Sequence, residues 1–117
     1  MKTLLAIAFV LAGCNQSNDW EPATGGNPTA GKEAIRAYGC AACHVIPGID
    51  MPGGRVGPPL AGFAKRAYIG GELPNTPENL ERWVRDPHQI EPHVAMPTLG
   101  LTQKEARDVA AYLYTLD

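Results

Sequence analysis

The sequence is poor in the features that mark several large classes of protein. Only 7% of its 117 residues are aromatic, lysine and arginine together number 10, and the formal net charge is −2. Without a basic stripe, we expect no binding to nucleic acid. The apolar run at residues 4–12 is too short to cross a bilayer as a helix. No segment has the pattern of a strand-rich region, so we expect a small domain built from helices and loops.

Cysteine is scarce as well, and two of the three cysteines lie in the segment Gly-Cys-Ala-Ala-Cys-His at residues 39–44. C-x-x-C-H is the attachment signature of c-type haem. Cys40 and Cys43 would add to the vinyl groups as thioethers, and His44 would bind the iron as its proximal ligand. A thioredoxin-like redox pair would need a βαβ setting, and a zinc site would need a fourth ligand. Neither is visible, so the motif predicts one covalently bound haem c.

The size and composition of the chain agree with a bound cofactor. Once a signal and a linker are removed, fewer than about ninety residues remain, and so short a chain buries only a modest apolar core. A covalently held macrocycle would supply the missing hydrophobic centre. Glycine and proline are abundant, at 13 and 11 residues. Seven of these glycines and five of these prolines fall between residues 45 and 75, as expected for loops that wrap a cofactor.

The N-terminus has the pattern of an export signal. Residues 1–13 contain one early lysine and a short apolar run that ends in Leu-Ala-Gly-Cys at Cys14, which resembles the lipobox of bacterial lipoproteins. That resemblance implies cleavage before Cys14, a lipid on its sulfur and an anchor on the periplasmic face of a bacterial membrane. The alternative is an ordinary secretory signal with an incidental cysteine. Residues 14–29 are polar and predict a flexible tether with a reach of about 20 Å, which leaves residues 30–117 as the domain.

Three helices are expected in that domain. The first covers residues 30–39, with Thr29 or Asn27 as its cap, and leads into the cysteine motif. The second starts at Thr-Pro-Glu-Asn, residues 76–79, and stops before Pro87. The third covers residues 103–116 behind a capping box. The rest is expected to be loop, with no strand, so the predicted fold class is all-α.

An iron that carries electrons without binding small ligands needs a second axial ligand. The side chains with a suitable lone pair are those of Met51, Met96, His88 and His93. Met96 is favoured because it lies in a loop between two predicted helices and is followed by a proline that restrains its backbone. Met51 is only seven residues beyond the motif, too close to reach the opposite face of the haem. His93 is the alternative ligand from the same loop as Met96.

Three further residues are candidates for contact with the haem or its ligand. Pro58 lies in Val-Gly-Pro-Pro-Leu, and its carbonyl could accept a hydrogen bond from the outer nitrogen of His44; alternatively, the prolines only stiffen the loop. Trp83 belongs to the apolar stripe of the second helix, so it is either a core residue or a donor to a haem propionate. Tyr68 is the remaining candidate.

From about residue 31 to the C-terminus, these landmarks resemble class I cytochrome c, the family of small monohaem electron carriers. In that family Gly31 and Tyr112 would lie where the terminal helices cross. The segments at residues 73–80, 85–87 and 96–97 are similar to the cytochrome c domain of subunit II of caa3-type haem–copper oxidases. We expect no cupredoxin domain or transmembrane pair before the motif, which would be a departure from that pattern.

The resemblance implies an electron carrier rather than an enzyme. We therefore expect a membrane-tethered carrier of single electrons in a bacterial respiratory chain, with membrane redox proteins as partners and a haem–copper oxidase as one candidate. The alternative is an electron-entry subunit of a larger oxidase or dehydrogenase complex. A gas sensor or peroxidase-like enzyme would need an open iron position, against which Met96 argues.

Overall fold

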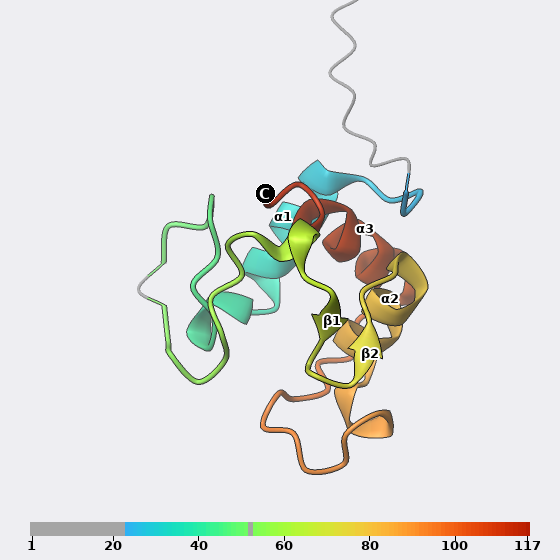
Figure 1. Ribbon diagram of the computed structural model, residues 1–117. Helices are drawn as coiled ribbons and strands as arrows, with labels where there is room; N and C mark the ends of the chain where they lie inside the picture. Colours follow the sequence, from blue (N-terminus) through green and yellow to red (C-terminus); the bar gives the residue numbers. More distant parts are fainter. Residues whose placement is uncertain (1–22, 52) are drawn as a thin grey trace, which may run out of the picture.

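The computed structural model describes residues 23–51 and 53–117. The expected signal, the lipobox with Cys14 and most of the expected tether lie outside the described residues. The described chain forms three α-helices, α1 (Pro28–Ala37), α2 (Pro77–Arg85) and α3 (Gln103–Leu113), joined by long loops (Figure 1). This confirms the existence of the three predicted helices and the predicted fold class. Two predicted ends were too late, because α1 ends at Ala37 rather than at residue 39 and α3 ends at Leu113 rather than at residue 116.

Each helix begins at a cap that the sequence specifies. The Asn27 side chain accepts from the amide of Ala30 at 3.0 Å, so α1 begins at Pro28, two residues before the expected boundary. Thr76 caps α2 in the same way. At α3, the Thr102 side chain and Glu105 form the predicted capping box. Side-chain oxygens of this kind satisfy amides that the first helical turn leaves without a partner.

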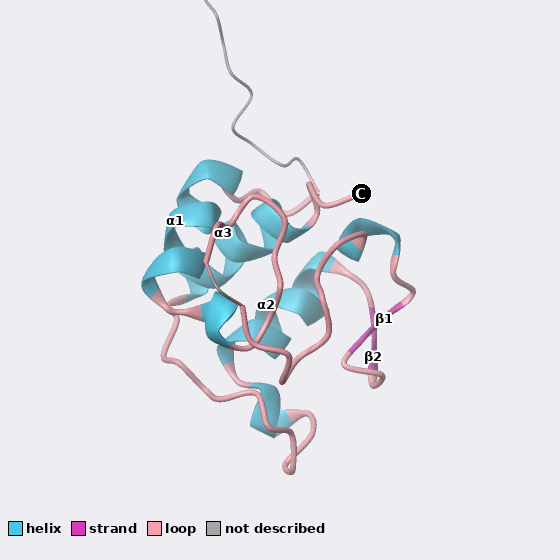
Figure 2. Ribbon diagram, turned by 90° about the vertical axis from the view of Figure 1, so that its left-hand side faces the viewer, coloured by secondary structure: helices cyan, strands magenta, loops and turns pink. Residues whose placement is uncertain are grey.

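The first and last helices pack closely against each other (Figures 1 and 2). A Cβ atom on Gly31 would lie 1.9 Å from the carbonyl oxygen of Asp108, so only glycine allows this approach. The amide of Asn27 donates to Oδ1 of Asp108 at 2.9 Å, which ties the start of α1 to the same point of α3. Tyr112 lies one turn further along α3 and donates to the carbonyl of Pro47 at 2.7 Å.

The core lies between these helices and the loops. The residues of the predicted apolar face of the last helix are all buried, although Leu116 lies beyond the end of α3: Ala106, Val109, Ala110, Leu113 and Leu116. The predicted stripe of α2 is buried too: Leu80, Trp83 and Val84. From the loop that follows the cysteine motif, Ile46 and Ile49 complete the same cluster. In the described part of the chain, no helix is long and apolar enough to cross a membrane.

The prediction that the domain contains no strand is wrong. Strands β1 (Tyr68–Ile69) and β2 (Leu73–Pro74) pair antiparallel, with Ile69 opposite Leu73 (Figure 2). Gly70 and Gly71 turn the chain between them with φ values of 58° and 74°. Two successive residues at positive φ match the tight turns that join short hairpin strands. The Gly-Gly pair was therefore the signal for this hairpin.

Candidate haem-binding site

The cysteine motif forms a single tight turn directly after α1. Gly39 follows the C-cap residue Tyr38 in the left-handed conformation, at φ 72°, and a 3₁₀ turn then covers Cys40–Ala42. The amides of Cys43 and His44 both donate to the carbonyl of Cys40, at 3.2 and 3.1 Å. The backbone of this turn therefore fixes the spacing of the two cysteines and of the histidine that follows them.

Both thiols are half-buried and free of disulfides. The pKa of the Cys40 thiol is raised, mainly by burial and further by the charge of the neighbouring Cys43. A redox-active dithiol usually depends on a lowered pKa, because the thiolate is the nucleophile. The raised pKa argues against the thioredoxin-like alternative. Among the described residues, no group of three or more His, Cys, Asp or Glu side chains is placed to hold a metal ion.

The outer nitrogen of His44 has the partner that the sequence suggested. Its Nδ1 lies 2.7 Å from the carbonyl oxygen of Pro58, which can only accept. Nδ1 therefore carries the proton and donates, and Nε2 keeps its lone pair for a metal. The same loop is bonded to the motif, since the amide of Gly57 donates to the carbonyl of Cys43 at 2.9 Å.

Gly57 is a site residue that the sequence analysis missed. A Cβ atom at this position would lie 2.2 Å from Cε1 of His44 and 2.6 Å from its Nδ1. No larger residue fits between the loop and the imidazole ring. The glycine before Pro58 was visible in Val-Gly-Pro-Pro-Leu, but only the tertiary structure places it against the ring.

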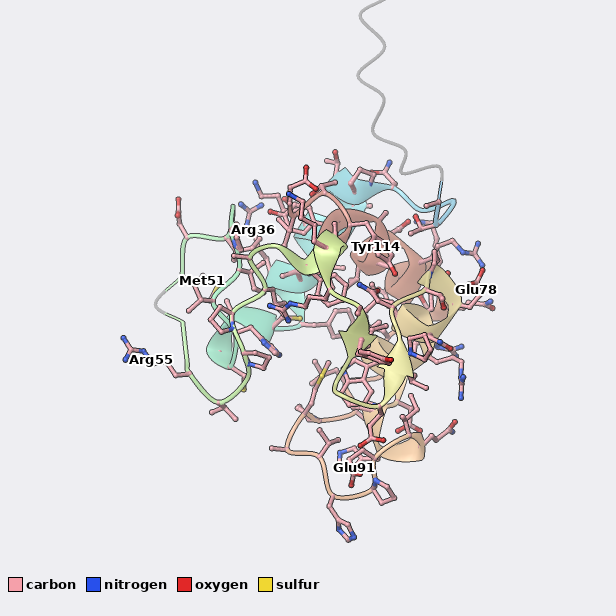
Figure 3. The ribbon with its side chains drawn as sticks, viewed as in Figure 1. Arg36, Met51, Arg55, Glu78, Glu91 and Tyr114 are labelled. Carbon is pink, nitrogen blue, oxygen red and sulfur yellow. The ribbon has the colours of Figure 1, made fainter. Side chains whose placement is uncertain are left out.

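Met96 and the other candidate axial ligands differ in their surroundings. Met96 is half-buried and packs against the hydrophobic core. Met51 is 48% exposed, and Figure 3 shows it on the loop that projects beside the cysteine motif. His88 and His93 are exposed. The assignment of Met96 stays a prediction, and its packing is what distinguishes it from the other three.

Trp83 and Tyr68 have opposite environments. Trp83 is only 8% exposed, and its six-membered ring packs against Gly70 so closely that a Cβ there would lie 2.4 Å away. The core interpretation of Trp83 is therefore confirmed. Tyr68 is 61% exposed on β1. Contact of either residue with a haem stays a prediction.

Asn75 is a second residue that sequence reasoning missed. Its Nδ2 donates to the carbonyls of Phe63 and Arg66 at 3.2 and 2.9 Å, and its Oδ1 accepts from the Tyr114 hydroxyl at 2.7 Å. This side chain ties the hairpin and the preceding loop to the end of α3. Burial is the main cause that raises the pKa of Tyr114 to about 12, so its hydroxyl is held as a donor.

The residues at this site fit a covalently bound haem. The motif supplies two thiols and an imidazole whose Nδ1 donates to a carbonyl, which leaves Nε2 as the ring nitrogen that can bind a metal, and the space beside the ring accepts only glycine. A thioether is available from a separate loop. Figure 1 shows that this loop, in orange, and the green loop after the motif project from different parts of the helical body. Imidazole and thioether together form one of the known axial pairs of haem iron.

Comparison with known proteins gives a consistent result. The family model described as "Cytochrome c" matches residues 28–117. Subunit 2 of cytochrome c oxidase from Alkalihalophilus pseudofirmus is 32% identical over 87 residues, which is 74% of this chain and 25% of that protein. The subunit from Bacillus sp. (strain PS3) is 36% identical over 88 residues, or 72% of this chain and 25% of that protein. The chain thus spans about a quarter of the length of these relatives.

Proposed function

Because the chain belongs to the cytochrome c family, which carries electrons, we propose that it is a monohaem carrier that passes single electrons at a bacterial membrane. The observation that carries this proposal is the 2.7 Å contact between Nδ1 of His44 and the carbonyl of Pro58. That contact leaves Nε2 of His44 available to iron. His44 also directly follows the segment that carries the two free thiols, Cys40 and Cys43. Haem supplies the Fe(III)/Fe(II) couple when bound, and the chain makes and breaks no bonds of a substrate.

The residues around the site each have a separate part in this role. The two cysteines would hold the haem covalently, so that it could not dissociate between reduction and oxidation. The Pro58 carbonyl fixes the ring orientation and tautomer of His44 and raises the basicity of the ligand. Met96 would provide the thioether, which favours reduced iron and raises the potential relative to a second histidine.

Replacement of Met96 by alanine tests the ligand assignment. We expect Met96→Ala to keep its covalent haem and to lose the weak near-infrared band of methionine bound to ferric haem. Because the distal position is then open, the reduced variant should bind carbon monoxide. Met51→Ala, which removes an exposed thioether, is the matched control and should behave as wild type. A wild-type protein without that band, or a Met96→Ala variant that keeps it, would show that another group binds the iron.

The partner is proposed from the relatives. Two similar proteins are subunits of cytochrome c oxidase, so a terminal oxidase is the acceptor we propose. The alternative is that this chain is itself the electron-entry subunit of a larger membrane oxidase or dehydrogenase complex. Purification from native membranes without crosslinking separates the two. A free carrier should elute alone, whereas an entry subunit should co-purify in fixed stoichiometry with other haem or copper proteins.

We propose that Cys14 carries a lipid that anchors the protein to the periplasmic face of the membrane. The support is the lipobox-like sequence before Cys14 and the polar stretch after it. Cys14→Ser should abolish lipid attachment and release the protein from membranes, with the haem spectrum unchanged. Mass spectrometry of the mature N-terminal peptide is the measurement. An unmodified Cys14 in the wild-type protein would instead indicate an ordinary secreted carrier.

A further inference from the structure

Few polar contacts hold the segment that carries Met96. In the described chain, residues 95–100 make a single hydrogen bond, from the Thr98 hydroxyl to Oδ1 of Asp86 at 2.9 Å, and none of these six residues is fully buried. The first half of the loop differs, because backbone hydrogen bonds connect several residues between 87 and 94. Segments with few hydrogen bonds and few buried contacts open at low free-energy cost. The polar restraint on the Met96 half of the loop therefore consists of one side-chain contact.

The acceptor of that hydrogen bond is fixed to the helical body. Asp86 caps the C-terminus of α2, and its amide donates to the carbonyl of Arg82 at 3.0 Å. The next residue, Pro87, is among the most deeply buried side chains in the described chain. α2 itself packs against α3. Thr98 is therefore bonded to a point whose position the core determines.

The backbone transmits this restraint from Thr98 to Met96. Only Pro97 separates the two residues, and its ring fixes its own φ. A proline also restricts the residue before it to extended backbone, which here is Met96. Two restrained residues thus connect the bonded hydroxyl to the thioether. The hydrogen bond joins two residues that are twelve positions apart in the sequence, and it opposes the conformational entropy that the intervening loop would gain on opening. A bond to an ionised carboxylate is also stronger than one between neutral groups.

We propose that Asp86 and Thr98 are positioning residues for the axial thioether: their hydrogen bond holds the Met96 segment closed over the haem. This inference rests on the proposed function, in which Met96 binds the iron. Neither side chain is a ligand of the haem iron. Both act through Met96, by setting how often the thioether leaves its position.

Displacement of the thioether by added imidazole tests the proposal. In the ferric holoprotein, imidazole nitrogen replaces the methionine sulfur on iron, so its apparent affinity reports how readily Met96 leaves. We expect Thr98→Val to raise that affinity by about five- to tenfold, because an exposed hydrogen bond to a charged acceptor is lost. Thr98→Ser keeps the hydroxyl and should return the affinity to that of wild type. Thr29→Val removes an exposed threonine hydroxyl from α1 and should have no effect.

A second pair of variants shows whether the effect passes through Met96. In the Met96→Ala background the thioether is absent, so adding Thr98→Val should leave the imidazole affinity unchanged. An equal change in both backgrounds, or a Thr98→Val protein that titrates as wild type, would overturn the proposal. If Met96→Ala alone changes neither the near-infrared band nor the imidazole affinity, the ligand assignment in the proposed function fails as well. The near-infrared band and the imidazole affinity of Met96→Ala therefore show whether the ligand assignment has failed or only the role of Asp86 and Thr98.

Discussion

Gly57 determines how closely the chain can pass beside the imidazole of His44. A Cβ atom on residue 57 would lie closer than the van der Waals distance to three atoms of the His44 ring. The adjacent Pro58 carbonyl is the acceptor for Nδ1, so the loop must stay at hydrogen-bonding distance from the ring. A side chain at position 57 would therefore move the ring or break that bond. This residue-scale constraint exists because one loop both approaches the ring and bonds to it.

Gly57→Ala should impair the proximal ligand. We expect the yield of covalently attached haem per protein to fall by at least about half, because overpacking beside the ring displaces the imidazole or the loop. The attached fraction should show a shifted Soret band. Gly53→Ala is the matched control in the same loop, since its Cβ would come no closer than 3.2 Å to its nearest neighbour, the carbonyl oxygen of His44. A Gly57→Ala protein with wild-type haem content and spectrum would show that the ring has more room than the structure indicates.

At the scale of elements, Glu105 links the first and last helices. Its Oε2 accepts from the amide of Thr102 at 2.9 Å, as part of the capping box of α3. The same oxygen accepts from the Tyr38 hydroxyl at 2.8 Å, at the C-terminus of α1. These hydrogen bonds lower the pKa of Glu105 below its usual value, and the bond from the Thr102 amide has the largest effect. The hydrogen bond to Glu105 raises the pKa of Tyr38.

The lowered pKa of Glu105 predicts the direction of a pH dependence. The folded state binds this proton less readily than the unfolded chain does, so the carboxylate stabilises the fold above its usual pKa. That stabilisation is lost as the pH falls through the lower folded-state pKa. We expect the free energy of unfolding, measured by denaturant titration at each pH, to fall less for Glu105→Gln than for wild type as the pH is lowered from about 5 to 3.

The control for this effect is Glu72→Gln, which removes an exposed carboxylate next to the hairpin turn. It should leave the acid-induced loss of stability as large as in wild type. A Glu105→Gln protein whose midpoint falls as steeply with acid as that of wild type would mean that other carboxylates cause the loss.

At the scale of the whole molecule, the described chain places its loops around a helical core of modest size. The three helices are short, at 10, 9 and 11 residues, and isolated helices of this length are marginal in water. They depend on packing against one another and against loop residues such as Ile46 and Leu60. A covalently bound macrocycle would add apolar contacts to these same loops.

The domain should therefore need its haem to fold. We expect the double variant Cys40→Ala/Cys43→Ala, which cannot attach haem, to lose about half or more of its far-ultraviolet helical signal, because the remaining core is small. Ala42→Ser, which alters an exposed residue between the two cysteines, should keep both haem and helicity. A cysteine-free motif with wild-type helicity and cooperative unfolding would show that the helices form a sufficient core by themselves.

The sequence alone determined the features that depend on local chemistry. Helix caps such as Thr102 with Glu105, the apolar faces of α2 and α3, and the attachment motif at residues 40–44 are all encoded within a few neighbouring residues. The resemblance to cytochrome c rested on such local motifs, and the family model confirms it. The carbonyl of Pro58 could also be anticipated, because a ligating histidine needs an acceptor for its second nitrogen.

Only the tertiary structure decided the contacts between segments far apart in the chain. Three such contacts depend on how the loops fold back on the helices: the approach of Gly57 to His44, the bonds of Asn75 to the loop before the hairpin and to the end of α3, and the Asp86–Thr98 contact. A glycine, an asparagine or a threonine in a loop has no periodicity that reveals its partner. The identity of that partner is set by the packing of α1, α2 and α3, which brings these loops to fixed positions.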